Sequence, residues 1–204
     1  MKNKSIGFFG GTFDPIHCGH LHLALSFLEA YQLDQILFCP ASVSPLKMHQ
    51  KPHVSPIHRE EMVKKAISPI PFFSYCDLEI HSEHPSFTID TISQLKNQFT
   101  SQKQDITIHL LLTDDALQDL GQWKKIDELL ELAPPLIGSR NANCSFPLDL
   151  SSSALAALKR GYTKFPLMDI SSTALRQRIK KNQYCGHLVP FHVLEYIHLN
   201  QLYE

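Results

Sequence analysis

Two histidines near the N-terminus stand where a phosphate could bind. His17 and His20 are three residues apart, and they follow the segment Gly10-Gly11-Thr12-Phe13-Asp14-Pro15. On a helical turn this spacing places both imidazoles on one face. Glycines let a ligand approach the backbone closely, and a helix N-terminus offers unpaired N–H groups and the positive end of its dipole. These residue types favour a polyphosphate over a neutral ligand.

The flanking residues indicate a strand, a turn and a helix around this motif. The apolar run Ile6-Gly7-Phe8-Phe9 comes before the glycines and is typical of a buried strand. After the histidines, Leu21, Ala24, Leu25 and Leu28 recur at the spacing of one helical face. The sequence therefore predicts that the glycine-rich segment joins the end of a strand to the start of a helix.

A second candidate anion site lies near the C-terminus. Ser171, Ser172 and Thr173 come before an apolar helical pattern, and hydroxyl residues are preferred helix N-caps, so we expect a helix to begin near Ser172. Arg176 falls in its first turns, where a cation opposes the helix dipole by about 0.3–1 kcal/mol unless an anion docks beside it. The residues therefore favour a phosphate at Arg176, and the two sites from opposite ends of the chain suggest a single cleft.

The composition argues against several classes of protein. The 204 residues carry a formal net charge of -1 and no basic block, which argues against a surface that coats nucleic acid. No apolar run is long enough to span a membrane, and no signal peptide is recognisable. The five cysteines are scattered without a Cys-x-x-Cys pair, which argues against a disulfide framework or a zinc knuckle. We therefore expect a reduced, cytoplasmic protein.

Alternating strand and helix patterns predict the fold. Expected strands cover 6–9, 35–39, 72–75, 77–80, 106–112 and 134–137, and expected helices cover 21–28, 59–67, 88–99, 114–120, 124–132, 189–202 and a segment from 172. The proline-rich stretch 40–58 is predicted to be a loop, and the polar stretch 141–153 an irregular connection. This order predicts an α/β protein with a Rossmann-like open, mostly parallel sheet and helices on both faces. We expect one domain over 1–204, in which 170–204 form a small C-terminal helical part that carries the second phosphate motif.

The motifs resemble those of a known enzyme family. The two phosphate motifs are similar to the His-x-Gly-His and Ile-Ser-Ser-Thr-x-x-Arg elements of the nucleotidyltransferase superfamily. The segments between them resemble bacterial nicotinate mononucleotide adenylyltransferases. The family's Pro-His-Lys element resembles Pro45-Leu46-Lys47, and its Arg-x-x-Met element resembles Arg59-Glu60-Glu61-Met62. Its Ser-Tyr-Thr-x-x-Thr element resembles Ser86-Phe87-Thr88-Ile89-Asp90-Thr91, its Gly-Ala-Asp-x-Leu element resembles Thr113-Asp114-Asp115-Ala116-Leu117, and its closing helix resembles the segment 188–197. Three positions depart from the pattern: Leu46 replaces histidine, Phe87 replaces tyrosine, and Thr113-Asp114 replace Gly-Ala.

The resemblance implies a reaction and a set of site residues. It implies that AMP moves from ATP to nicotinate mononucleotide, giving nicotinate adenine dinucleotide and pyrophosphate in NAD biosynthesis, with Mg²⁺ accompanying ATP and no protein metal ligand. By the same resemblance the catalytic residues are His17, His20 and Arg176. The ATP-binding residues are Gly10, Gly11, Thr12, Phe13, Asp115, Ser171, Ser172 and Thr173, and the acceptor-binding residues are Lys47, Thr88 and Trp123.

Several alternatives stay open at this point. The acceptor could be nicotinamide mononucleotide or phosphopantetheine, and the chain could be a nucleotide sensor without turnover or a zinc-binding module. Asp115 could simply complement a helix dipole, Trp123 could be a core aromatic residue, Thr88 could be an N-cap and Lys47 could be solvated. We expect small-molecule partners and neither nucleic acid nor membrane, and the sequence leaves a homo-oligomer open.

Overall fold

Six parallel strands form the centre of the molecule. A computed structural model of the chain describes residues 4–204 apart from 44–50, 140–145, 148 and 167. The strands lie in one sheet in the order β3-β2-β1-β4-β5-β6, and all five neighbouring pairs are parallel. The strands are β1 (Lys4–Gly11), β2 (Gln35–Pro40), β3 (Phe73–Tyr75), β4 (Ile106–Thr113), β5 (Pro135–Ser139) and β6 (Tyr162–Lys164).

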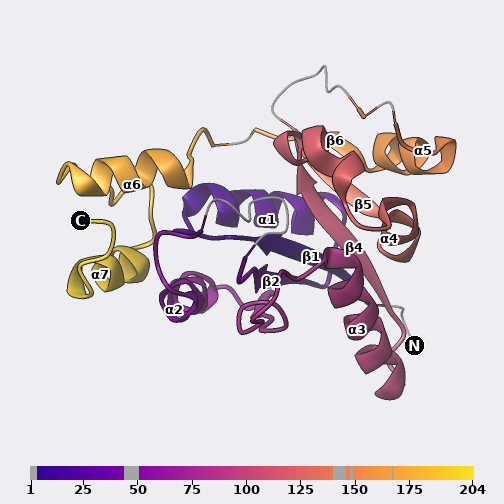
Figure 1. The fold of residues 1–204 in the computed structure, drawn as a ribbon, viewed down its shortest axis with the longest axis horizontal. Coiled ribbons are helices and arrows are strands. Elements are labelled where there is room, and N and C mark those ends of the chain that lie inside the picture. The colour runs from indigo at the N-terminus through magenta and orange to yellow at the C-terminus, as the bar shows by residue number, and fades with distance from the viewer. Residues whose placement is uncertain (1–3, 44–50, 140–145, 148, 167) are drawn as a thin grey trace.

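Helices connect the strands and cover the sheet (Figure 1). Seven α-helices and one long 3₁₀ segment are assigned within the described ranges. They are α1 (Cys18–Ala30), α2 (Pro56–Ile67), α3 (Thr88–Ser101), the 3₁₀ helix η2 (Asp114–Gln122), α4 (Ile126–Leu132), α5 (Ser152–Gly161), α6 (Ser172–Lys180) and α7 (Phe191–Leu199). The predicted α/β fold with helices on both faces is confirmed, and the sheet is parallel throughout.

Alternation along the strands divides the core into two clusters. Ile36 and Phe38 of β2 belong to the cluster that includes buried residues of α1, α2, α6 and α7, whereas Leu37 and Cys39 belong to the cluster that includes α3, η2, α4 and α5. Successive strand side chains point to opposite faces of a sheet, so a strand buried on both sides is apolar at every position. This explains why β2 shows a continuous apolar run rather than an alternating pattern.

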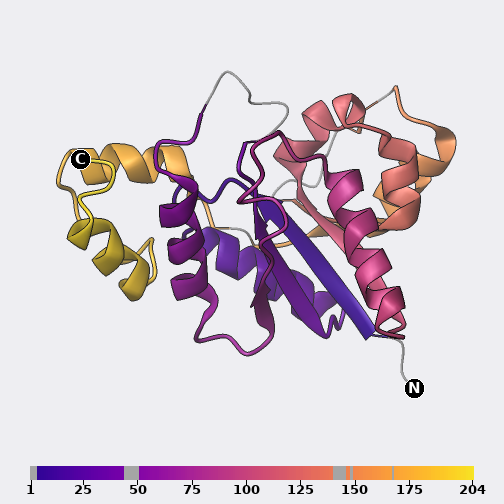
Figure 2. The same ribbon diagram turned by 60° about the horizontal axis from the view of Figure 1, so that its bottom comes forward.

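The C-terminal helices return to the first phosphate motif. Figures 1 and 2 both show α6 and α7 side by side at the end of the molecule next to α2. The His58 Nδ1 atom on α2 lies 2.9 Å from the Tyr196 hydroxyl on α7, and the Cys18 N–H at the start of α1 donates to the Leu188 carbonyl at 2.9 Å. These bonds fasten the last part of the chain beside the N-terminus of α1.

The structure corrects several predicted elements. No strand is assigned to residues 77–80, of which 78–80 form turns, and the burial of both Glu79 and Ile80 departs from the alternation expected of a strand. Helix α2 begins at Pro56 instead of residue 59, since proline fits the first turn of a helix. Helix α5 and strand β6 were not predicted, and α5 begins inside the stretch expected to be irregular. None of the described helices is long and apolar enough to cross a membrane.

Candidate active site

The sheet order places the topological switch point at β1 and β4. These two strands are neighbours, and the chain continues from β1 towards β2 on one side and from β4 towards β5 on the other. In open α/β sheets, ligands bind outside the carboxyl ends of the strands at such a switch point. The glycine-rich segment directly follows β1, and Asp114 and Asp115 directly follow β4. The chemistry-bearing residues of both strands therefore meet at the expected place.

Phe13 anchors the turn that follows β1. Its backbone has a φ of 49°, which is the left-handed region that residues with side chains rarely adopt, and the residue is 2% exposed. The ring packs edge-on against His20, with the centroids 5.1 Å apart. Gly10 is exposed, and Gly11 and Thr12 are half-buried, so their backbone remains accessible.

The two histidines stack on each other at the start of α1. His17 is the N-cap residue, and its ring centroid lies 3.7 Å from that of His20, at 26° between the ring planes. The His17 N–H donates to His20 Nδ1 at 3.2 Å. In the neutral imidazole one nitrogen carries the proton and the other accepts, so this bond places the His20 proton on Nε2. Nε2 of His20 is therefore a hydrogen-bond donor.

Both histidines are neutral in the free protein. Burial lowers the pKa of His17 to about 4. Burial also lowers the pKa of His20 well below its ordinary value, and the neighbouring His17 lowers it further. The Nδ1 atom of His17 is buried without a hydrogen-bond partner among the described residues. A polyphosphate would reverse the direction of these shifts, because a nearby negative charge favours the charged form of an imidazole.

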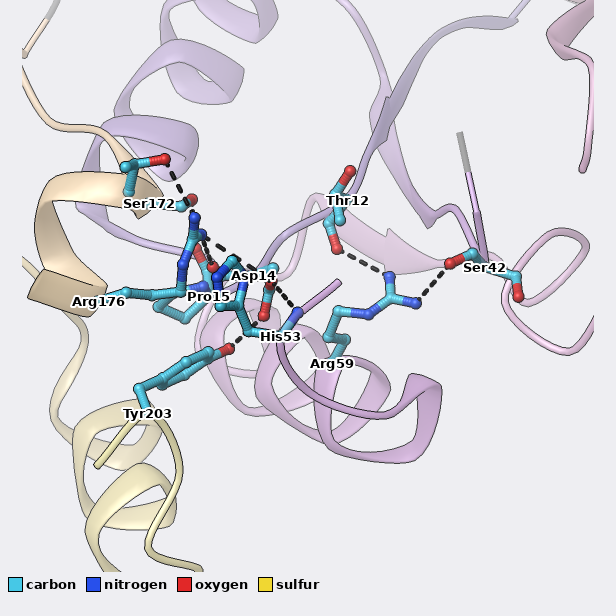
Figure 3. Close-up of polar contacts among 10 residues, drawn as sticks. Thr12, Asp14, Pro15, Ser42, His53, Arg59, Ser172, Arg176 and Tyr203 are labelled. Atoms are coloured by element: carbon cyan, nitrogen blue, oxygen red, sulfur yellow. Dashed lines mark hydrogen bonds and ion pairs between the residues drawn. The ribbon is translucent and has the colours of Figure 1, made fainter. Parts of the chain in front are cut away.

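The second phosphate motif meets the first one directly. Arg176 donates through Nη1 to the Asp14 carbonyl at 2.6 Å (Figure 3). It also donates through Nη2 to Thr173 Oγ1 at 3.1 Å. Ser172 donates to the Pro15 carbonyl at 2.9 Å. Two of the five guanidinium N–H groups are used in these bonds, so Arg176 keeps donors for a ligand. The predicted single cleft built from both ends of the chain is consistent with these contacts.

The hydroxyl residues of this motif have different local roles. Ser171 is the N-cap of α6, and its side chain accepts from the Ala174 N–H at 3.2 Å. The expected helix start at Ser172 is therefore confirmed. Thr173 holds the guanidinium of Arg176, and Ser172 ties the helix to the turn after β1. The three side chains thus fix the position of Arg176 relative to the histidines.

Arg59 joins the turn after β1 to the segment after β2. Its guanidinium is completely buried and donates to the backbone carbonyls of Thr12, Ala41 and Ser42. Figure 3 shows the bonds to Thr12 and Ser42. Burial lowers the pKa of Arg59, while the charge of Asp14 opposes that shift. The sequence contained a clue to this role, because Arg59 lies on the same helical face as the apolar Met62 and Val63.

The predicted acceptor-binding residues lie beside α3 and η2. Thr88 is the first residue of α3, whose N-cap is Phe87, and Trp123 follows η2, half-buried against the α3-side cluster. Lys124 brings the two segments together: its ammonium lies 2.8 Å from Asp90 Oδ2 and 4.7 Å from the centre of the Phe87 ring. Lys47 lies outside the described residues.

Asp114 and Asp115 behave differently at the end of β4. The Asp114 carboxylate accepts from Ser139 Oγ at 2.7 Å and from the Asp115 N–H at 3.2 Å. The Asp115 residue is exposed. The additional carboxylate at position 114 is therefore directed to β5, and Asp115 remains accessible to a ligand. Across the described ranges, no group of three or more His, Cys, Asp or Glu residues could hold a metal ion.

A parallel sheet in this order, with phosphate motifs at its switch point, is the architecture of doubly wound nucleotide-binding proteins. The model of the cytidylyltransferase-like family matches residues 8–178. The chain belongs to the cytidylyltransferase-like family, a family of nucleotidyltransferases.

The chain is similar along its full length to particular known proteins. The chain is 35% identical over 201 residues to the nicotinate-nucleotide adenylyltransferase of Bacillus subtilis (strain 168), covering 98% of this chain and 99% of that protein. It is 34% identical over 203 residues to the probable nicotinate-nucleotide adenylyltransferase of Oceanobacillus iheyensis, covering 98% and 97%. The structure of Plasmodium falciparum nicotinic acid mononucleotide adenylyltransferase complexed with NaAD shares the fold, with a TM-score of 0.71 at 22% identity and coverage of 98% and 97%. The family resemblance predicted from the motifs is confirmed.

The lowered pKa of His17 predicts a pH dependence of stability. The unfolded histidine has a pKa of about 6.5, so between pH 6.5 and 4 the unfolded chain binds the extra proton and the folded protein loses stability as the pH falls. Relative to a His17→Asn variant, the wild type should lose about 2 kcal/mol of unfolding free energy between pH 7 and pH 5. Urea denaturation of both proteins at the two pH values measures this difference.

The comparison with His17→Asn is needed because the titration of Glu79 changes the pH dependence of stability in the opposite direction. Burial raises the pKa of Glu79 to about 7, so its contribution to stability is lost as the pH rises through 7. Both proteins carry Glu79, and its effect cancels in the difference. Parallel pH profiles for wild type and variant would contradict the assignment of a buried, neutral His17.

The three carbonyl contacts of Arg59 predict a large effect of a conservative substitution. Lysine keeps the positive charge, but one ammonium group cannot replace a planar fork that reaches three carbonyls. Arg59→Lys should therefore lower the free energy of unfolding by about 2–4 kcal/mol. Arg160→Lys on exposed α5 is the matched control and should change it by less than about 0.5 kcal/mol. Equal urea midpoints for the two variants would show that the carbonyl contacts of Arg59 contribute little to the free energy of unfolding.

Proposed function

We propose that this protein transfers AMP from ATP to nicotinate mononucleotide, producing nicotinate adenine dinucleotide and pyrophosphate in NAD biosynthesis. The observation that carries the proposal is the meeting of the two phosphate motifs, in which Arg176 and Ser172 bond to the carbonyls of Asp14 and Pro15, just before the histidine pair. The full-length likeness to relatives named nicotinate-nucleotide adenylyltransferase supports the same substrate pair.

The reaction needs charge stabilisation more than acid–base catalysis. A phosphate oxygen of the acceptor attacks the α-phosphorus of ATP in line with the leaving group, and the bond from that phosphorus to the pyrophosphate oxygen breaks. The nucleophile is already an anion, so no general base has to remove a proton. Catalysis then consists of positioning two anions and stabilising the charge that moves onto pyrophosphate.

The histidines and Arg176 are suited to that task. His20 presents an N–H donor at Nε2, because its Nδ1 atom is occupied by the His17 N–H. We assign both histidines to the triphosphate, and Arg176 with Ser171, Ser172 and Thr173 to its β- and γ-phosphates. Backbone groups of the segment 10–13 would contact the α-phosphate.

The remaining assignments concern the adenosine and the acceptor. Asp115 is exposed at the carboxyl end of β4 and would accept hydrogen bonds from the ribose hydroxyls of adenosine. Trp123 would stack on the pyridine ring of the acceptor, Thr88 would bind the same end, and Lys47 would contact phosphate. The Lys124–Asp90 pair supports a shared role for Thr88 and Trp123, since it holds their segments together.

Mg²⁺ fits this site as a companion of ATP. This cation is commonly held by substrate phosphates with only one or two carboxylates from the protein. When bound, it would neutralise part of the phosphate charge. The described residues supply hydrogen-bond donors around the phosphate motifs rather than an assembled metal cluster, and we propose that the protein contributes those donors while ATP carries the metal.

Pyrophosphate release with different acceptors tests the proposed reaction. With ATP and Mg²⁺, we expect rapid release with nicotinate mononucleotide and slow release with nicotinamide mononucleotide or phosphopantetheine. Faster release with either of the other acceptors would keep the phosphate site and overturn the assignment of Trp123 and Thr88. ATP binding without release for any acceptor would favour a nucleotide sensor.

Substitution of His20 separates catalysis from folding. His20→Ala removes the Nε2–H donor and should lower kcat/KM by on the order of 100-fold, with little change in Tm. His22→Ala is the matched control, because His22 lies on the same helix and its Nε2 is 2.7 Å from the Pro166 carbonyl. It should leave kcat/KM within about twofold of the wild type, because surface substitutions usually change energies by less than 0.5 kcal/mol. A fall in Tm for His20→Ala that matches its loss of activity would make His20 structural.

A further inference from the structure

Tyr203 connects the segment after α7 to the first phosphate motif. Its hydroxyl donates to Asp14 Oδ1 at 2.7 Å, across 189 positions of sequence. We propose that Tyr203 is a positioning residue for ATP, which acts through the Asp14 carboxylate to keep Arg176 directed at the phosphates. The inference rests on the proposed function, because it takes Arg176 as a phosphate ligand.

Asp14 is a buried carboxylate with donors on both oxygens. Its side chain is 6% exposed. Oδ1 accepts from Tyr203, and Oδ2 accepts from the His53 N–H at 2.8 Å, with His53 Nδ1 at 3.2 Å (Figure 3). A buried carboxylate is tolerated when its oxygens are hydrogen-bonded. The donors from Tyr203 and His53 therefore satisfy Asp14 without a close ion pair.

Arg176 lies next to this carboxylate but does not pair closely with it. The guanidinium bonds to the Asp14 carbonyl at 2.6 Å, while Nη1 remains 3.9 Å from Asp14 Oδ2. A direct charge-assisted bond would be about 2.7–2.9 Å long. The Tyr203 hydroxyl holds Oδ1, while Oδ2, the oxygen 3.9 Å from Arg176, accepts from His53. Arg176 is held by the backbone of Asp14 and keeps donors for a ligand.

The backbone is left-handed on both sides of the Tyr203–Asp14 bond. Tyr203 has a φ of 68°, and Phe13, which precedes Asp14, has a φ of 49°. Aromatic residues rarely adopt this region. Burial and the Asp14 charge raise the pKa of Tyr203, so its phenol remains a donor at neutral pH.

Loss of the Tyr203 hydroxyl should redirect Arg176. Without that donor, the buried Asp14 carboxylate loses one of its hydrogen bonds, and Arg176, 3.9 Å from its Oδ2, is a neighbouring cation that can close on it. A guanidinium drawn into a close pair with Asp14 is no longer available to phosphate. The expected consequence is weaker ATP binding with unchanged binding of the acceptor nucleotide.

The test measures binding of a non-hydrolysable ATP analogue, α,β-methylene ATP, by calorimetry. Tyr203→Phe should raise its Kd by about fivefold, while the Kd of nicotinate mononucleotide stays the same. Tyr196→Phe is the matched control, because it removes a hydroxyl from the same C-terminal part that contacts His58 and not Asp14. It should leave both Kd values within about twofold of the wild-type values. The corresponding change in binding free energy is smaller than the 1.4 kcal/mol of a tenfold change. Equal effects of the two variants on the analogue would overturn the proposal.

A second variant tests whether the effect passes through Arg176. In an Arg176→Gln background there is no guanidinium to redirect, so adding Tyr203→Phe should change the Kd of the analogue no further. A further fivefold weakening in that background would show that Tyr203 acts independently of Arg176 and would overturn the proposal.

The binding assay separates this inference from the proposed function. It needs neither turnover nor a particular acceptor. If the wild type binds the ATP analogue and Tyr203→Phe binds it equally well, the inference alone fails. If the wild type does not bind the analogue, both the proposed function and the inference built on it fail.

Discussion

The turn after β1 is held in place by two buried ionic groups of opposite sign. Arg59 fixes the turn from the side of α2 by bonding to three backbone carbonyls, and Asp14, within the turn, accepts bonds from His53 and Tyr203. Buried charges are costly unless their hydrogen-bonding groups are met. Because Asp14 is bonded by His53 and Tyr203, Arg176 keeps donors for a ligand. The positions of the histidines follow from this turn.

The histidine pair is neutral in the free protein. Burial disfavours the imidazolium form of both residues, and the neighbouring His17 adds to this effect at His20. Among the described residues of the two motifs and α2, Arg59 is a positive charge enclosed by carbonyls, and Arg176 is one held by a carbonyl and a hydroxyl. A neutral stacked pair avoids the cost of two adjacent cations in a site without ligand. The Nε2–H donor of His20 is then available before any proton is gained.

The sequence predicted the elements whose patterns are long and locally determined. The strand before the glycines, the helix start at Ser172 and the parallel α/β order all follow from periodicity and capping. Residues 77–80 were predicted wrongly, since their alternation is typical of a strand although Glu79 is buried. Strand β6 has three residues, too few for a period to appear. The site residues Arg59, His53 and Tyr203 were not predicted, because their partners lie far away in sequence and only the fold brings them to Asp14 and Thr12.

The departure from the family pattern at Thr113-Asp114 shows how local bonding can preserve a site. An added carboxylate beside a site for anions would repel its ligands if it faced them. Asp114 instead accepts bonds from Ser139 on β5 and from the backbone of Asp115. Its charge is stabilised by these bonds, and Asp115 keeps the exposed position where the family motif has its aspartate. Because the Ser139 hydroxyl is completely buried, the bond that holds Asp114 is shielded from competing water. The substitution therefore changes the support of the turn while the accessible carboxylate is retained.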